Sequence, residues 1–123
     1  MNYLLVGAFG AAGAIARYGL DRLVSDATHG QFPWGTLTVN ILGAFALGAL
    51  VALTTERLII SPTWRTAVGI GFLGSFTTFS TYAYESVRLA QDGALGLALL
   101  NTVGMVVLGL TAAVLGLAVG RAL

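Results

Sequence analysis

Cysteine is absent from this sequence of 123 residues, and charged residues make up only 9% of it. Without thiols, the chain can form neither disulfide bonds nor thiolate metal sites. Soluble domains carry about 25% charged residues, so the low share of charge excludes an ordinary soluble domain. The six arginines stand singly along the chain, which argues against a basic patch, and no nucleic-acid partner is expected.

Residues suited to catalysis are also scarce. His29 is the only histidine, and no nucleophile is paired with a base in a recognisable motif. The glycines lack the spacing of phosphate-binding loops. The sequence therefore predicts a protein that is not an enzyme.

Apolar residues dominate what is present, at 57% of the chain. A helix that crosses a bilayer needs about 20 mostly apolar residues. Hydropathy predicts four such helices, at residues 3–23, 36–58, 64–90 and 93–120. The first stretch has no basic start and is too long for a signal sequence, so we expect it to be retained. The predicted fold is an all-α integral membrane bundle, with residues 1–123 forming one domain.

Small residues recur on the predicted helices, as at Gly43, Gly48, Gly116 and Gly120. Helices in lipid associate through close van der Waals contact, which small residues permit. This pattern favours ordinary packing over a functional role.

The arginines are divided evenly between the two sides of the predicted bundle, with Arg17, Arg22 and Arg88 on one side and Arg57, Arg65 and Arg121 on the other. An excess of basic residues in short loops normally sets the orientation of a membrane protein, so an even division leaves both orientations open. An antiparallel, dual-topology homodimer follows as a hypothesis. A single orientation set by other features is the alternative.

Residues 71–82 (GFLGSFTTFSTY) combine glycines with five hydroxyl side chains inside the third predicted span: Ser75, Thr77, Thr78, Ser80 and Thr81. Such side chains compete for backbone hydrogen bonds. A non-helical run at membrane depth is tolerated where it lines a polar path, and its carbonyls and amides can then bind ions. The pattern favours a third helix broken near its middle. The alternative is an intact helix whose hydroxyls bond within their own turn.

Aromatic residues recur at helical spacing in the same span, at Phe72, Phe76 and Phe79, with Tyr82 three residues further. A stripe of this kind is usually core packing. Ring edges carry a positive partial charge, however, so rings presented edge-on beside a polar path favour an anion.

Four polar residues inside the predicted spans each allow two interpretations. Asn40 and Asn101 can donate to a dehydrated anion, or they can bond to a neighbouring helix. Arg17 either snorkels to the interface or forms a basic vestibule that attracts anions. Glu85 lies three residues before Arg88, a spacing typical of a helix-surface ion pair, with a place near an ion path as the alternative.

Three motifs resemble the Fluc (CrcB-like) family of small fluoride channels: residues 13–18 (GAIARY), 35–40 (GTLTVN) and 71–81 (GFLGSFTTFST). The similarity extends over nearly the full length. It implies a dual-topology antiparallel homodimer whose broken third helices cross at the centre. It also implies a fluoride-selective channel with two pores, which passively exports cytoplasmic fluoride across the plasma membrane, the bacterial inner membrane.

The same resemblance implies roles for particular residues. A structural sodium ion at the dimer interface is expected on the backbone carbonyls of Gly74 and Thr77. The vestibule is expected at Arg17. The implied fluoride pathway includes Asn40, Phe79, Tyr82, Thr78, Ser80, Thr81, Thr36, Asn101 and Glu85.

The sequence departs from the family pattern in two places. Tyr82 stands where the family has a second phenylalanine, which keeps the ring edge and adds a hydroxyl. On the fourth helix, the turn positions that often carry hydroxyls in the family are Asn101, Met105 and Gly109, and only Asn101 can donate to an anion.

Two other functions stay open from the sequence, and the chemistry of the residues does not separate fluoride from chloride. A small multidrug-type, proton-coupled transporter has a similar length and number of helices. It needs a carboxylate deep in the membrane, however, which the first predicted helix lacks. A non-transporting membrane subunit would explain the glycines but not the clustered hydroxyls.

Overall fold

The computed structural model describes residues 2–123, and within this range it contains helices and connecting turns but no strand. The elements along the chain are α1 (Asn2–Ala27), α2 (Trp34–Val51), η1 (Ala52–Glu56), α3 (Pro62–Trp64), η2 (Arg65–Leu73), α4 (Gly74–Phe76), α5 (Phe79–Gln91) and α6 (Leu95–Ala122). The all-helical fold predicted from hydropathy is confirmed.

Three continuous helical stretches are long and apolar enough to cross a membrane: Asn2–Ala27, Trp34–Glu56 and Leu95–Ala122. They match the first, second and fourth predicted spans within a few residues at each end. The remaining predicted span, residues 64–90, is divided among α3, η2, α4 and α5. Large apolar side chains are exposed along the bundle, including Ile70 on η2 and Leu110 on α6, each about two-thirds accessible. The chain is therefore a multi-pass membrane protein.

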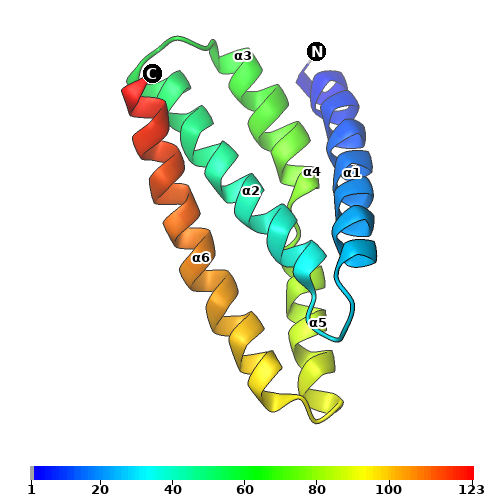
Figure 1. Ribbon diagram of the computed structural model, residues 1–123. Helices are drawn as coiled ribbons and strands as arrows, with labels where there is room; N and C mark the ends of the chain where they lie inside the picture. The colour runs from blue at the N-terminus through cyan, green and yellow to red at the C-terminus, as the bar shows by residue number, and fades with distance from the viewer. Residues whose placement is uncertain (1) are drawn as a thin grey trace.

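The successive stretches run in alternating directions, so that α1 begins and α6 ends at the same end of the bundle (Figure 1). Helix α2 packs along α6, and α1 packs against η2 and α4. Helix α5 packs instead against α6. We call residues 62–91, which comprise α3, η2, α4 and α5, the third segment. Its main neighbour changes from α1 to α6 at the junction between α4 and α5.

Glycines allow the closest of these helix contacts. A Cβ atom on Gly116 would collide with the backbone of Phe45 in α2, and one on Gly13 would collide with the Phe72 carbonyl of η2. Without those methyl groups, the backbones approach to van der Waals contact. The predicted packing role of Gly48, Gly116 and Gly120 is confirmed, because all three lie in the α2–α6 contact.

Two segments, η1 and η2, are π-helical, which the sequence analysis did not predict. A π-helix is wider than an α-helix by about one residue per turn, is rare, and frequently occurs at functional sites. Segment η2 directly precedes α4, so the backbone is irregular over much of the third segment.

The ion pair that the spacing favours between Glu85 and Arg88 is absent from the described part of the chain. Arg88 instead contacts Asp92, with Nε 3.4 Å from Oδ2, and bonds to the Tyr84 hydroxyl. Asp92 lies one turn beyond Arg88 on the exposed face, whereas the Glu85 side chain is half-buried. The arginine therefore finds a partner at lower cost in desolvation than at Glu85.

Candidate functional site

The α4–α5 junction consists of Thr77 and Thr78, both with extended backbones. Thr77 has φ −89° and ψ 160°, and Thr78 has φ −150° and ψ 112°. The Thr77 N–H still donates to the Leu73 carbonyl at 3.1 Å, as in a helix. At Thr78 this ladder ends, so polar backbone groups need other partners in the interior of a membrane protein.

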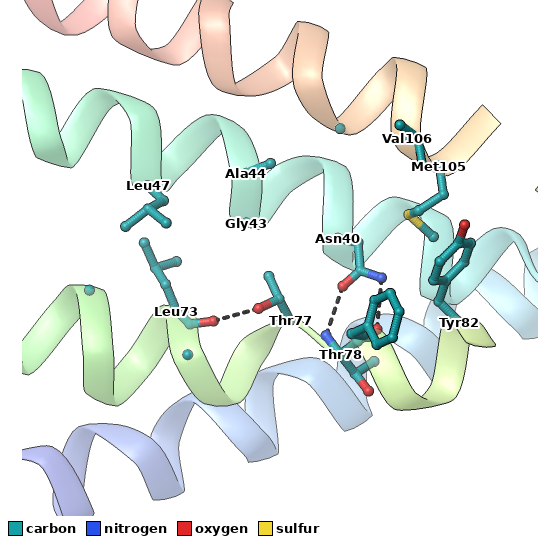
Figure 2. Close-up of a pocket in the computed structure, with 14 residues that line it drawn as sticks. Asn40, Gly43, Ala44, Leu47, Leu73, Thr77, Thr78, Tyr82, Met105 and Val106 are labelled. Carbon is teal, nitrogen blue, oxygen red and sulfur yellow. Dashed lines mark hydrogen bonds between the residues drawn. The ribbon is translucent and has the colours of Figure 1, made fainter. Parts of the chain in front are cut away.

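Asn40 of α2 supplies partners for both polar groups of Thr78. Its Nδ2 donates to the Thr78 carbonyl at 3.0 Å, and its Oδ1 accepts from the Thr78 N–H at 2.8 Å (Figure 2). A carboxamide matches a peptide group in donor and acceptor, so Asn40 acts as a one-residue strand partner. One further amide hydrogen of Asn40 is available for a second bond.

The Thr78 side chain caps the helix that follows. Its hydroxyl accepts from the Thr81 N–H at 3.2 Å and donates to the Thr81 hydroxyl at 2.9 Å, with Ser80 Oγ 3.3 Å away. Threonine at this position is a favourable N-cap. The first turn of α5 therefore begins at the junction, with the positive end of its dipole there.

The junction also diverts the donors that two carbonyls would have in a continuous helix. The carbonyls of Gly74 and Thr77 would accept from the N–H groups of Thr78 and Thr81. The Thr78 N–H bonds to Asn40, and the Thr81 N–H bonds to the Thr78 hydroxyl. Both carbonyls thus lose their usual helical donor, and Gly74 is exposed.

A cavity of about 410 Å³ opens beside the junction, between α2, the third segment and α6 (Figure 2). Its polar lining comes from Asn40, Thr77 and Thr78. Its apolar lining on the α6 side comes from Met105, Val106 and Gly109. The other lining residues are Gly43, Ala44, Leu47, Gly69, Leu73, Gly74, Phe79 and Tyr82.

A smaller cavity of about 220 Å³ lies on the other side of Thr78, near the end of α1 and the start of α2. Its polar lining comes from Arg17, Tyr18, Asp21, Thr36, Thr78 and Thr81, with Ala14 and Val39 completing it. Among the described residues, no ion pair joins Arg17 to a carboxylate. Thr78 borders both cavities and so stands between them.

The four aromatic residues of the predicted stripe form two pairs, one on each side of the junction. Phe72 stacks on Phe76, with ring centroids 5.8 Å apart. Phe79 meets Tyr82 edge-on at 5.6 Å and 63°. Only the second pair lines the larger cavity, where Phe79 is 77% exposed. The predicted single stripe is thus divided, because the extended residues interrupt the helical period.

Asn101 and Glu85 are in the lining of neither cavity. Asn101 is fully buried, and its Nδ2 donates to Ser86 Oγ at 2.9 Å. One oxygen of each side chain, Asn101 Oδ1 and Glu85 Oε1, is buried without a hydrogen-bond partner among the described residues. Thr36, by contrast, is buried and lines the smaller cavity.

Some contacts at the site involve residues for which the sequence predicted no role in the site. Gly43 faces the Thr77 methyl group and leaves room for it. Thr102 offers its carbonyl to the Tyr82 hydroxyl at 2.7 Å. Ser86 bonds to Asn101 and to the Tyr82 carbonyl. The only sequence signal for Ser86 and Thr102 was a hydroxyl within an apolar helix.

Comparison with known proteins places this architecture in a family. The family model for CrcB-like protein, Camphor Resistance (CrcB), matches residues 4–117. The chain therefore belongs to the CrcB family of membrane proteins.

Relatives named fluoride-specific ion channel FluC are similar over nearly their whole length. The Koribacter versatilis protein is 49% identical over 115 residues, which cover 94% of this chain and 90% of the relative. The Magnetococcus marinus protein is 49% identical over 112 residues, with 91% of each chain covered. The Thermus thermophilus protein is 46% identical over 122 residues, covering 99% of this chain and 97% of the relative.

Proposed function

We propose that this chain is a fluoride channel that lets cytoplasmic fluoride leave the cell passively. Two independent facts support the proposal: its relatives are named fluoride-specific ion channels, and a polar junction at Thr77 and Thr78 lies beside a cavity. The observation that carries most weight is the reciprocal bonding of Asn40 to Thr78. This bonding holds Asn40 at the cavity and leaves its second amide hydrogen as a neutral donor for an anion.

The proposed fluoride pathway follows the lining of the two cavities. Arg17 attracts the anion into the smaller cavity, which acts as the vestibule, and Thr36, Thr78 and Thr81 offer hydroxyls there. In the larger cavity, the second Asn40 amide hydrogen and the Phe79 ring edge replace water around the ion. Ser80 and the amides of the first turn of α5 add donors at the positive end of that helix.

The family architecture implies a sodium ion, and the residues present fit one. Hard cations take oxygen ligands, and backbone carbonyls serve as such ligands in channels. Gly74 and Thr77 each have a carbonyl whose helical donor is engaged elsewhere. When bound, the ion would supply positive charge that holds the two junctions of a dimer together.

The proposed assembly is an antiparallel homodimer in the bacterial inner membrane, with residues 62–91 of each copy crossing the membrane as one helix broken at the junction. The larger cavity would then be closed by the second copy, giving two pathways. Gly74 at this cavity is exposed and its carbonyl has lost its helical donor, and lipid cannot satisfy that group, which favours a partner chain on this face.

Efflux from liposomes tests the function. Purified protein is reconstituted into liposomes loaded with potassium fluoride, valinomycin is added, and an electrode follows fluoride release. Parallel liposomes contain potassium chloride, and protein-free liposomes serve as the control. Fast release of fluoride with negligible release of chloride is expected. Equal release of both ions contradicts selectivity, and release of neither contradicts the channel.

A further inference from the structure

Two hydrogen bonds join α5 to α6 next to the larger cavity, and a third, within α5, connects them. The Tyr82 hydroxyl donates to the Thr102 carbonyl at 2.7 Å, and the Ser86 hydroxyl donates to the Tyr82 carbonyl at 2.9 Å. Asn101 Nδ2 completes the set by donating to Ser86 Oγ at 2.9 Å. We name this set of Tyr82, Ser86, Asn101 and Thr102 the α5–α6 clasp.

The clasp is one connected set of hydrogen bonds and is partly buried. Tyr82 is 7% exposed and Asn101 is fully buried. One link runs from the Tyr82 side chain to the Thr102 carbonyl. The other runs from the Tyr82 carbonyl through the Ser86 hydroxyl to the Asn101 amide. Interhelical hydrogen bonds are the main directional forces between helices in lipid, where apolar side chains give little preference for one register.

The clasp fixes how the Tyr82 ring is presented. Its hydroxyl is directed at α6, near Met105, so the polar end of the side chain is satisfied there (Figure 2). The ring body packs with Leu37 and Met105 and meets the exposed Phe79 ring edge-on. Tyr82 therefore presents its ring to the cavity, as a phenylalanine at this position would. Its hydroxyl holds the ring in place through the bond to α6.

We propose that Tyr82, Ser86 and Asn101 are positioning residues for the ion pathway, acting together to set the place of the Tyr82 and Phe79 rings beside the cavity. This inference rests on the proposed fluoride channel. Asn101 lies in neither cavity lining and spends an amide hydrogen on Ser86. It therefore acts through Tyr82, and its amide makes no contact with the ion.

A double-mutant cycle tests the clasp. Tyr82→Phe removes one link and Ser86→Ala removes the other, while the ring is kept in both variants. Fluoride efflux and the ratio of fluoride to chloride efflux are measured in liposomes for each variant and for the double variant. Each single change is expected to lower the fluoride rate about five- to tenfold, as loss of one hydrogen bond allows. The double variant is expected to lose no more than the larger single loss, because the residues act as one unit.

Two controls separate positioning from a general loss of folding. Tyr84→Phe removes the hydroxyl of an exposed tyrosine on the same helix, and the fluoride rate is expected to be unchanged. Ser86→Thr keeps a hydroxyl at position 86 and is expected to retain most of the rate that Ser86→Ala loses. Elution on gel filtration and the unfolding temperature are recorded for every variant.

The outcomes also separate this inference from the function. Failure of the unmodified protein to release fluoride overturns the proposed channel. Normal fluoride release and selectivity in Tyr82→Phe and Ser86→Ala overturn the clasp alone. Losses that add in the double variant, or that follow the unfolding temperature, also overturn it, because a merely structural role predicts both.

Discussion

At the scale of single residues, the Asn40 side chain makes the two hydrogen bonds that a neighbouring strand would make to Thr78. The extended backbone of Thr78 has one donor and one acceptor, and one carboxamide satisfies both. Leaving either group unpaired in the protein interior would cost about 1–3 kcal/mol. The conformation of the junction therefore depends on a side chain from a helix 38 positions earlier in the sequence.

Replacement of Asn40 by aspartate tests this dependence. The carboxylate can still accept from the Thr78 N–H but cannot donate to the Thr78 carbonyl, and its charge repels an anion by about 4 kcal/mol at close range. We expect Asn40→Asp to lower fluoride efflux by roughly a hundredfold or more, with a lower unfolding temperature. Thr38→Ala, on the same helix and away from both cavities, is the control and should behave like the parent. Unaltered fluoride efflux in Asn40→Asp would refute the role of Asn40.

Phe79 presents the most exposed ring at the larger cavity. Phe79→Ile keeps similar bulk but removes the positive ring edge, whose contacts are worth about 0.5–1.5 kcal/mol. Fluoride efflux is expected to fall about three- to tenfold, while chloride efflux stays negligible. Phe45→Ile makes the same chemical change on α2, outside both cavities, and should leave the efflux rate unchanged. Equal rates in the two variants would show that the aromatic edge is dispensable.

The residue scale also shows what the sequence could and could not predict. Hydroxyl density singled out the region of Thr77 and Thr78, and the neutral amide singled out Asn40. The sequence could not predict that these residues bond to one another, because their contact depends on how α2 packs against the third segment. The Tyr82 hydroxyl is similar, since its acceptor is a backbone carbonyl that carries no sequence signal.

At the scale of elements, apolar length predicted four spans, and three of them match continuous membrane-capable helices to within a few residues. Residues 52–56 and 65–73 were expected to be α-helical but are π-helical. The difference between these helices is one residue per turn, and no residue type specifies it. Tertiary contacts select it, so a prediction from a single sequence does not reach it.

The α2–α6 contact gives the clearest prediction for an element. Gly116 faces the backbone of Phe45 and Ala49, so a methyl group there must push the helices apart. Gly116→Ala is expected to lower the free energy of unfolding by about 1–3 kcal/mol, a typical cost of overpacking. Gly104→Ala, on the same helix with open space around it, should be neutral or stabilising by about 0.5–1 kcal/mol. Denaturant unfolding in detergent measures both, and equal effects would exclude a packing role for Gly116.

At the scale of the whole molecule, the proposed sodium site joins two copies, so its loss should be seen in assembly. Each copy would contribute only the two backbone carbonyls of Gly74 and Thr77, without a charged side chain. The affinity for sodium should therefore depend on two copies supplying ligands together. Replacing sodium by a large organic cation should lower both the dimer fraction, measured by light scattering in detergent, and fluoride efflux. Adding sodium back should recover both the dimer fraction and fluoride efflux. Adding the same concentration of choline instead is the control and should recover neither. Indifference of both readouts to sodium would contradict the site.

The even division of arginines bears on how the molecule inserts. Arg22 lies near the end of α1 and Arg88 in the last turn of α5, at one end of the bundle, and Arg57 and Arg121 lie at the other. Because the basic residues do not favour one orientation, we expect about half of the copies to insert each way. Since the chain has no cysteine, one introduced thiol reports the orientation without interference.

Two single-cysteine variants, His29→Cys and Ser61→Cys, place the thiol in exposed loops at opposite ends of the bundle. A membrane-impermeant maleimide is added to intact spheroplasts, and labelling is compared with that after permeabilisation. In a dual-topology protein, each variant is labelled to about half before permeabilisation, because the even charge division leaves both orientations populated. In a protein with one orientation, one variant is labelled fully and the other hardly at all. Full labelling of one variant and little labelling of the other would therefore rule out the antiparallel dimer. Equal partial labelling of both variants would show that copies insert in both orientations, as the antiparallel dimer requires.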